Sequence, residues 1–478
     1  DRLCSGLRDA GISLCVDAVV NHPADTLDWA RRALAGDPTF QSYFRMFPDR
    51  ELPDRYEAHL REIFPDTDPG SFTWRPEIER WVWTTFHDYQ WDLDYSNPAV
   101  LVEMSGVLLD LANRGADVLR IDAPAFLWKE LGTMCENLDG AHQILQVWRI
   151  LTELACPGVL LLAEAIVPIE DTLRYFGSGD TADRESHLAY HHFFMVLLWS
   201  ALAEQNARLL TAALRRAGPV PAGSAWCTYV RSHDDIGWAI TPEDAGTVGL
   251  DDHLHREFLS EFYTGSFPMS FARGKVFQFN PETLDRRVSG TTASLAGLEQ
   301  GLEAGDETAV DLTFARLRLL YALVAAHGGI PLVWSGDELA LRNDPADSRV
   351  EEDSRWVHRP ALEPGDVADR LDPATPAGRM FSAVSEVMAA RAGSPELHAR
   401  AASEAEWSGN DAVFCLVRSG HAGRLIVLAN VTDSLQTVDA ERLGELGLAD
   451  GTVDRLSGRP WSGDVGLAPY EVVWLASE

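Results

Sequence analysis

The stretch Asn97–Asp122, NPAVLVEMSGVLLDLANRGADVLRID, contains the pattern that decides the fold. Asn97–Arg114 predicts a helix, and Asp117–Asp122 is a short apolar run that predicts a buried strand. A helix that leads directly into a strand is the unit of a parallel sheet with crossover helices. The strand ends on Asp122, so the sequence predicts a carboxylate at the C-terminal end of a parallel strand.

The same alternation continues along the chain. Further strands are predicted at Ile12–Val20, Val159–Glu164, Ala225–Ser232 and Ile330–Ser335, and further helices at Ala141–Ala155, Phe193–Ala217, Asp311–His327 and about Pro376–Ala390. Short alternating runs after about Glu404 predict a small antiparallel β-domain: Ala412–Val417, Arg424–Asn430 and Tyr470–Leu475. The expected fold class is α/β, a (β/α)8 barrel of the TIM type with a C-terminal antiparallel β-domain.

The first residues predict a chain that enters a barrel midway. Leu3–Gly11 has the pattern of the last turns of an amphipathic helix closed by glycine, and a strand follows at once. We therefore expect the first two β/α units to be missing and the chain, expressed alone, to be insoluble or inactive. We expect residues 1–395 to form the barrel, with insertions at 23–95 and 236–309, and residues 396–478 to form a C-terminal β-sandwich domain.

Composition excludes several classes of function. The net charge is −33, and only Lys129 and Lys275 of the 40 basic residues are lysines, which argues against nucleic acid as a partner. No stretch has the apolar length of a membrane span. The six cysteines show no CxxC or metal-ligand spacing, so we expect small buried thiols in a reducing, cytoplasmic setting, with secretion left open. We expect no cofactor and no metal.

Four segments place an acid after an apolar run: Ser13–Asp17 followed by Asn21 and His22, Val118–Asp122, Leu160–Glu164, and Tyr229–Asp235. The C-terminal ends of barrel strands form the active-site face, so we expect Asp122, Glu164 and Asp234 to meet in one cavity. Clustered carboxylates raise one another's pKa, which is costly unless chemistry requires them. The pattern predicts an enzyme.

Asp122 and Glu164 suit glycoside cleavage with retention, which needs an ionised nucleophile and a protonated acid about 5 Å apart. Arg120 lies on the same strand face as Asp122 and would keep it ionised. The apolar run before Glu164 would raise the pKa of its carboxyl, as a general acid requires. A single strand-end Asp is more often a helix cap, and the Asp17, Asn21 and His22 group could merely fix a loop. Only the ordered combination argues against chance.

In that order, Asp17-x-x-x-Asn21-His22, Arg120-x-Asp122, Glu164 and His233-Asp234 resemble the four motifs of the α-amylase superfamily of retaining glycoside hydrolases and transglucosidases. Gly329–Glu338 is similar to that family's last barrel strand. More specific segments resemble the amylosucrase group of glycoside hydrolase family 13: Leu60–Asp66, Trp83–Phe86, Gln90–Leu93, Ser232–Trp238, Ser270–Gly274, Phe277–Pro281, Arg287–Thr291 and Asp353–Trp356. The second insertion is similar to an extra domain of that group.

The resemblance implies an activity and its partners. Amylosucrase cleaves sucrose, holds the glucosyl unit on its Asp, and transfers it to the 4-hydroxyl of an α-1,4-glucan, with water as a competing acceptor. Sucrose and an α-glucan would then be the partners, without nucleic acid or membrane. The alternatives are a sucrose hydrolase of the same group, an α-amylase, and a catalytically silent relative that binds sugar.

The resemblance also implies roles for individual residues. Asp122 would be the nucleophile, Glu164 the acid/base and Asp234 the transition-state stabiliser. His22, His233 and Arg120 would line the glucosyl subsite, and Arg355 would close its floor through a salt bridge. The fructosyl or acceptor region would contain Arg61, Phe86, Gln90, Arg256, Gln278, Asn280 and Arg287. Structural support would come from Asp17, Asn21 and Asp235.

Some positions depart from the amylosucrase pattern. The early segment with a stacking Tyr and the Asp that pairs with Arg355 is absent, so Arg355 is expected to lack that partner. Pro124 and Arg286 differ from the residues expected there, which leaves product specificity open. Asn21 helps to bind calcium in many α-amylases, but amylosucrase resembles a metal-free branch.

Overall fold

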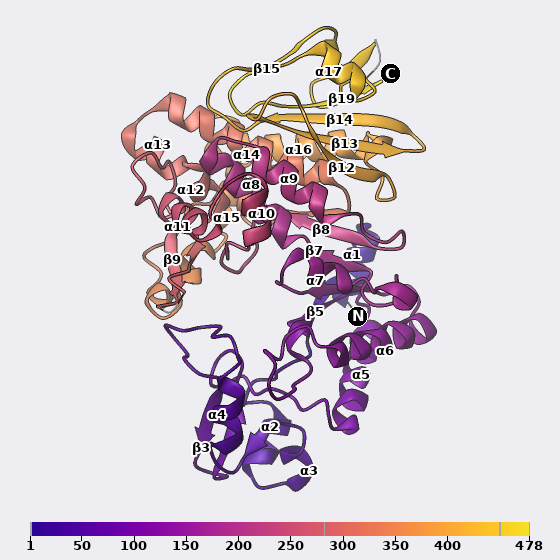
Figure 1. The fold of residues 1–478 in the computed structure, drawn as a ribbon, viewed down its shortest axis with the longest axis vertical. Coiled ribbons are helices and arrows are strands. Elements are labelled where there is room, and N and C mark those ends of the chain that lie inside the picture. Colours follow the sequence, from indigo (N-terminus) through magenta and orange to yellow (C-terminus); the bar gives the residue numbers. More distant parts are fainter. Residues whose placement is uncertain (1, 282, 449–450, 478) are drawn as a thin grey trace. The chain divides into compact units, whose positions relative to one another are not determined.

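The computed structural model describes residues 2–281, 283–448 and 451–477 (Figure 1). The chain forms two compact units, and each is described by itself. Unit 1 comprises the described residues up to Tyr190 together with Val220–Ala225. Unit 2 comprises His191–Pro219 and the described residues from Trp226 onward.

Unit 1 is built on parallel strands. They are ordered β1 (Cys15–Val19), β5 (Val118–Asp122), β6 (Leu160–Glu164) and β7 (Leu188–Tyr190). The helix α1 (Arg2–Asp9) precedes β1, α5 (Pro98–Asn113) leads into β5, and α6 (Asp139–Ala155) leads into β6. The register pairs Asp122 with Val19 on one side and with Glu164 on the other. Both acids therefore lie at the same end of neighbouring strands, as predicted.

Local chemistry explains why Asn97–Asp122 folds as helix and strand. The Asn97 side chain caps α5 by accepting a hydrogen bond from the Ala99 N–H, and Pro98 occupies the first turn, where its missing N–H costs nothing. The buried face of α5 contains Val100, Met104 and Leu108, spaced four residues apart. The interior of β5 is apolar and fully buried at Leu119 and Ile121.

A lobe of unit 1 follows β1. It contains α2 (Asp28–Leu34), α3 (Pro38–Gln41), α4 (Glu51–Glu57) and a small antiparallel sheet in the order β2 (Met46–Phe47), β4 (Arg80–Trp83), β3 (Phe72–Arg75). Figure 1 shows α2, α3, α4 and β3 gathered together. Its core includes Phe47, Tyr56, Phe72 and Trp83. Later in the unit, α7 (Ile169–Arg174) precedes β7.

Unit 2 pairs β8 (Ala225–Tyr229) with β11 (Ile330–Leu332) in parallel. Its main helices are α8 (His192–Glu204), α9 (Arg208–Ala217), α14 (Glu307–His327) and α16 (Pro376–Ala392). The region Phe193–Ala217 is helical, as predicted, but it forms two helices. Gln205 has φ +53° and ends α8, because the left-handed conformation cannot continue a right-handed helix. The strand β7 escaped prediction because it is only three residues long.

The segment after β8 forms compact structure of its own. It contains α10 (Pro242–Thr247), α11 (Asp252–Tyr263), an antiparallel hairpin of β9 (Lys275–Phe279) and β10 (Arg286–Ser289), α12 (Thr292–Ala296) and α13 (Leu298–Ala304). The segment after β11 contains short helices, including the 3-10 turns η3 (Asp337–Leu339), η4 (Ser348–Glu351) and η5 (Ser354–His358), and the helix α15 (Pro364–Asp369). A last turn, η6 (Pro395–Leu397), follows α16.

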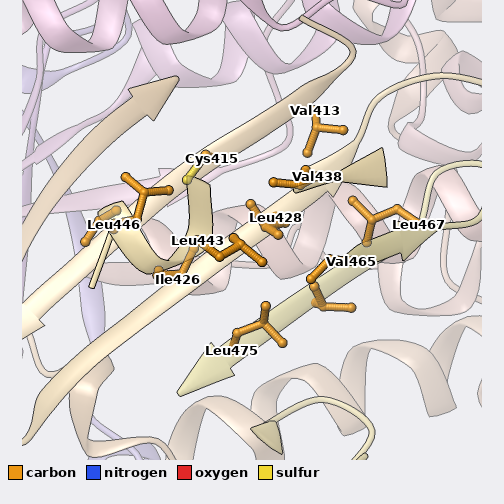
Figure 2. Packing of buried hydrophobic residues seen from close by; sticks show 12 residues of the cluster. Val413, Cys415, Ile426, Leu428, Val438, Leu443, Leu446, Val465, Leu467 and Leu475 are labelled. Carbon is orange, nitrogen blue, oxygen red and sulfur yellow. The ribbon is translucent and has the colours of Figure 1, made fainter. Parts of the chain in front are cut away.

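The chain ends in an antiparallel β-domain, as predicted. Its larger sheet has the order β12 (Ala402–Trp407), β13 (Val413–Gly420), β14 (Gly423–Asn430), β19 (Val472–Ser477), β16 (Thr452–Asp454), β17 (Pro460–Trp461). A ribbon of β15 (Gln436–Val438) and β18 (Val465–Leu467) and the helix α17 (Ala440–Glu445) complete it. Figure 2 shows their apolar side chains packed together, with Leu428 and Leu475 from the sheet near Leu443 of α17 and Val465 of β18. The predicted domain limits stay a prediction.

The cysteines in the described part of the chain are all free, and three of them, Cys135, Cys227 and Cys415, are buried. Cys15 is exposed, contrary to expectation. The reason is that β1 is the outermost strand of its sheet, and only Ala18 of its side chains is buried. None of the helices built from described residues is both long and apolar enough to cross a membrane.

Candidate active site

The centre of the site in unit 1 is the Arg120 guanidinium. It donates to Asp122 Oδ1 at 2.7 Å and to Asp17 Oδ1 at 2.5 Å, and its other terminal nitrogen lies 3.8 Å from Glu164 Oε1. Arg120 and Asp122 are separated by one residue on β5, so their side chains share a face of the strand. One cation therefore links the predicted nucleophile, the predicted acid/base and the predicted supporting Asp.

Charge explains why this arrangement is stable. The Arg120 side chain is 10% exposed, and burial alone would lower its pKa. Glu164, Asp122 and Asp17 outweigh burial and raise the pKa of Arg120 above its ordinary value. The guanidinium is thus permanently charged, and it offsets repulsion among three carboxylates that the register of β1, β5 and β6 brings together.

Glu164 lies in a more polar setting than the sequence predicted. The run before it is apolar, but its Oε2 accepts a hydrogen bond from the Ala123 N–H at 3.1 Å, and Arg120 lies on its other oxygen. Ala123 has φ +49°, a conformation that costs a non-glycine residue energy, and Pro124 then opens a short 3-10 turn. The chain bends sharply after Asp122, and this bend points the Ala123 N–H at Glu164.

His22 is neutral and oriented. Burial lowers the pKa of its imidazole, although Asp92 and Asp122 act in the opposite direction. The Asn21 amide lies 3.2 Å from Nδ1, and as a donor it leaves the ring proton on Nε2. The Phe86 ring packs on the imidazole with centroids 4.8 Å apart. The structure therefore joins His22 to Phe86, which the sequence assigned to neighbouring subsites.

A buried ion pair that the sequence did not reveal lies behind His22. Lys129 Nζ is 2.7 Å from Asp92 Oδ2, and the two side chains are 2% and 0% exposed. Asp92 also accepts from Asn21 Nδ2 at 3.0 Å and from Thr85 Oγ1 at 2.6 Å. The rarity of lysine in this chain was the available signal. Lys129 places a fixed positive charge against Asp92 and thereby orients Asn21 and His22.

Among residues 2–281, 283–448 and 451–477, no group of three or more His, Cys, Asp or Glu side chains is arranged to hold a metal ion. Asn21, the residue linked to calcium in many α-amylases, directs its amide nitrogen at His22 and Asp92.

The remaining predicted residues of unit 1 have local partners. Arg61 is exposed and donates from two nitrogens to the Glu136 carboxylate, at 3.0 and 3.1 Å. Gln90 is half-buried, and its Oε1 accepts a hydrogen bond from the His87 N–H at 3.2 Å. Their predicted contact with substrate stays a prediction.

Asp234 is the centre of the site in unit 2. Arg355 Nη1 donates to its Oδ1 at 3.2 Å, Arg359 Nη2 lies 3.8 Å from the same oxygen, and His233 Nε2 lies 3.3 Å from Oδ2. Arg355 also grips Asp353 through two nitrogens, at 3.0 and 2.8 Å. A residue two positions earlier in its own loop thus supplies Arg355 with a carboxylate, whereas the amylosucrase pattern places that partner in an early segment.

The predicted acceptor residues of unit 2 divide into two groups. Arg287 lies 3.4 Å from Asp235, whose pKa burial raises, and packs over Phe277, on which the Arg355 guanidinium also lies. Arg256 instead holds its own segment together through Asp252 and Asp285. Gln278 is buried with φ +54°, and Asn280 Oδ1 accepts a hydrogen bond from the Thr283 N–H at 3.2 Å.

Fold and site together define a class, a glycoside-processing α/β enzyme of the TIM type with an antiparallel β-domain at its C-terminus, in which two carboxylates lie at the ends of neighbouring strands. Residues 1–236 match the alpha-amylase catalytic-domain family, and residues 410–475 match the C-terminal immunoglobulin-like domain of D-apionate lactonase. Residues 1–236 are thus similar to the catalytic domain of the alpha-amylase family.

Similar proteins include phosphorylases and synthases. Glucosylglycerate phosphorylase of Escherichia coli K12 is 27% identical over 470 residues, which cover 97% of this chain and 78% of that protein. A trehalose synthase/amylase of Mycolicibacterium smegmatis is 33% identical over 251 residues, 52% of this chain and 40% of that protein. Sucrose 6F-phosphate phosphorylase of Thermoanaerobacter thermosaccharolyticum has the same fold, with a TM-score of 0.68 at 16% identity over 90% of this chain and 81% of that chain.

Proposed function

We propose that this protein is a retaining α-glucosyltransferase that cleaves sucrose, holds the glucosyl unit on Asp122, and transfers it to the 4-hydroxyl of an α-1,4-glucan with release of fructose. The observation that carries the proposal is the Arg120 bridge, which joins Asp122 and Glu164 through one guanidinium. A bridged pair on adjacent strands suits the close spacing of about 5 Å that retention requires.

The proposed steps follow from these groups. Glu164 protonates the fructosyl oxygen as Asp122 attacks the anomeric carbon, and the ionised Glu164 then takes the proton of the acceptor hydroxyl. His22, with its Nε2 proton, donates to a sugar hydroxyl. Asp234, assigned from the motif in unit 2, stabilises the positive charge of the oxocarbenium-like transition state.

Local charge favours a neutral acceptor. The ion pairs around Asp234 join three carboxylates to three guanidinium groups: Asp234, Asp235, Asp353, Arg287, Arg355 and Arg359. Each cation is matched by a carboxylate, so this cluster offers no excess positive charge to a phosphate dianion. A glucan hydroxyl is neutral and needs no excess positive charge.

Phosphorolysis is the second candidate, because glucosylglycerate phosphorylases of Escherichia coli and Allomeiothermus silvanus match this chain over 97% of its length. In that reaction phosphate replaces the glucan and gives glucose 1-phosphate. The two candidates share the glucosyl–enzyme step and differ only in the acceptor.

One experiment separates the candidates. The purified protein is incubated with sucrose and glycogen, with and without inorganic phosphate, and fructose, glucose, glucose 1-phosphate and glucan are measured together. We expect fructose in excess of glucose, the difference recovered as glucan, and no effect of phosphate. Equimolar glucose and fructose would indicate a hydrolase. Phosphate-dependent glucose 1-phosphate, from sucrose or from glucosylglycerate, would indicate a phosphorylase.

A further inference from the structure

We propose that His358 is a positioning residue that fixes the orientation of Asp234 and couples it to the strand that contains Arg287. The inference rests on the role proposed for Asp234. His358 ends η5, is 1% exposed, and lies outside the motifs by which the site was found.

Both ring nitrogens of His358 are engaged. Nδ1 accepts a hydrogen bond from the Gly290 N–H at 3.0 Å, and Nε2 lies 2.9 Å from the His233 carbonyl oxygen. A backbone N–H can only donate, so Nδ1 is unprotonated. The ring proton is therefore on Nε2, which donates it in a hydrogen bond to the His233 carbonyl oxygen. These two hydrogen bonds therefore require the neutral imidazole with its proton on Nε2.

The surroundings preserve that tautomer. Burial and the charge of Arg231 lower the pKa of His358 to about 3, with Arg359 acting in the same direction and Asp234 in the opposite one. The His358 carbonyl also accepts from Arg231 Nη1 at 3.0 Å. Arg231 is itself fixed, because its Nε and Nη2 donate to buried Asp337 at 2.9 and 2.7 Å.

At one end, the ring fixes the peptide that precedes Asp234. The His233 carbonyl accepts a second hydrogen bond, from Arg359 Nε at 2.8 Å. Two donors on one carbonyl define the plane of the His233–Asp234 peptide. That plane sets the direction of the Asp234 side chain toward Arg355, 3.2 Å away.

At the other end, the ring holds the end of β10. Gly290 follows this strand, and a Cβ added at Gly290 would lie 2.7 Å from Leu295, so the backbone there has little freedom to shift. Arg287, three residues earlier, lies 3.4 Å from Asp235. Displacement of the ring would therefore change the alignment of Asp234 and of Arg287 together.

Two isosteric substitutions separate these contacts. In H358Q the side-chain amide can replace Nε2 and donate to His233, whereas in H358N it can replace only the Nδ1 acceptor for Gly290. The donors are sucrose and α-glucosyl fluoride, whose leaving group needs little protonation. Active sites are counted from the burst of covalent glucosyl–enzyme, so that loss of folded protein is removed from kcat.

We expect H358N to lower kcat per active site about 10- to 100-fold on both donors with KM changed less than about threefold, because a misdirected Asp234 loses transition-state stabilisation. H358Q should keep kcat within about fivefold but raise the ratio of glucose to fructose, because Gly290 and the acceptor strand are released. Two results would overturn the proposal. One is that both variants lose the same total activity but keep the wild-type kcat per active site, and the other is that neither variant changes.

The two donors keep this proposal distinct from the proposed function. A wild-type protein that turns over α-glucosyl fluoride but not sucrose would disprove the sucrose assignment. The comparison of H358N with H358Q would still decide the role of His358, from kcat on the fluoride alone.

Discussion

The carboxylates of unit 1 and the carboxylate of unit 2 are held in place by different means. Asp122 and Glu164 lie at the ends of hydrogen-bonded parallel strands, and one cation serves both of them together with Asp17. Asp234 lies beyond the end of β8, and two arginines and a histidine converge on it. In unit 1 the sheet register does the positioning, whereas in unit 2 side-chain contacts do.

The difference teaches where each site is vulnerable. Loss of Arg120 in unit 1 would remove a cation that three carboxylates share. Loss of one cation in unit 2 would leave Asp234 with another. Substitution of the shared arginine of unit 1 is therefore predicted to abolish most of the activity, whereas substitution of one arginine near Asp234 in unit 2 is predicted to reduce the activity only in part.

The largest effect is expected at the nucleophile. Asp122→Asn removes the attacking oxygen anion, so kcat on sucrose should fall by about 10⁴-fold or more. Glu164→Gln is the matched control, since it should fail on sucrose but still form a covalent glucosyl–enzyme with α-glucosyl fluoride, visible by mass spectrometry. A covalent adduct in Asp122→Asn would contradict the assignment.

Substitution of one arginine in each unit tests this difference between the two units. Arg120→Met leaves three carboxylates without their cation, and kcat/KM should fall about 10³-fold. Arg359→Met leaves Arg355 on Asp234, and the loss should be about 10-fold. Initial rates at matched active-site concentration give both values. Equal losses would remove the distinction drawn between the two units.

The buried pair of unit 1 should determine stability more than any pair near Asp234. Lys129→Met leaves the Asp92 carboxylate buried without its opposite charge, and the free energy of unfolding should fall by about 3 kcal/mol. Denaturant unfolding measures this change. The double variant Asp92→Asn with Lys129→Met removes both charges and should recover most of the loss, and a further decrease would show that charge is not the cause.

The smallest effect concerns a polar pair of unit 2 away from Asp234. Burial raises the pKa of Glu204 from 4.5 to about 7, while His255, whose Nδ1 lies 3.1 Å away, stays neutral because burial lowers its pKa to about 4. The folded protein holds a proton on Glu204 that the unfolded chain releases, so Glu204 by itself makes stability decline as pH rises from about 4.5 to about 7. His255 acts in the opposite direction, because the unfolded chain protonates it and the folded protein does not. Glu204→Gln removes only the first contribution, so its stability relative to wild type should increase over this pH range, with a gain of about 1 kcal/mol at pH 8. A Tm difference between variant and wild type that does not change with pH would refute this reading.

The strands and their acids could be predicted because both depend on local pattern. An apolar run marks a buried strand, parallel strands end on one face, and Arg120 and Asp122 share a face by alternation. The supports could not be predicted. Lys129 meets Asp92 across 37 residues, and His358 meets His233 across 125, without a periodic signal. The polar setting of Glu164 depends on the left-handed turn at Ala123, and an alanine at that position does not predict such a turn.

The sequence by itself thus determined the parallel α/β fold, the antiparallel C-terminal domain and the four acid-bearing segments, because hydrophobic periodicity and order along the chain decide these. Only the tertiary structure decided which charge compensates which: Arg120 for three carboxylates, Lys129 for Asp92, and Asp353 as the partner of Arg355. Ion pairs and hydrogen bonds depend on distances of a few ångströms in space, and separation along the chain does not specify those distances.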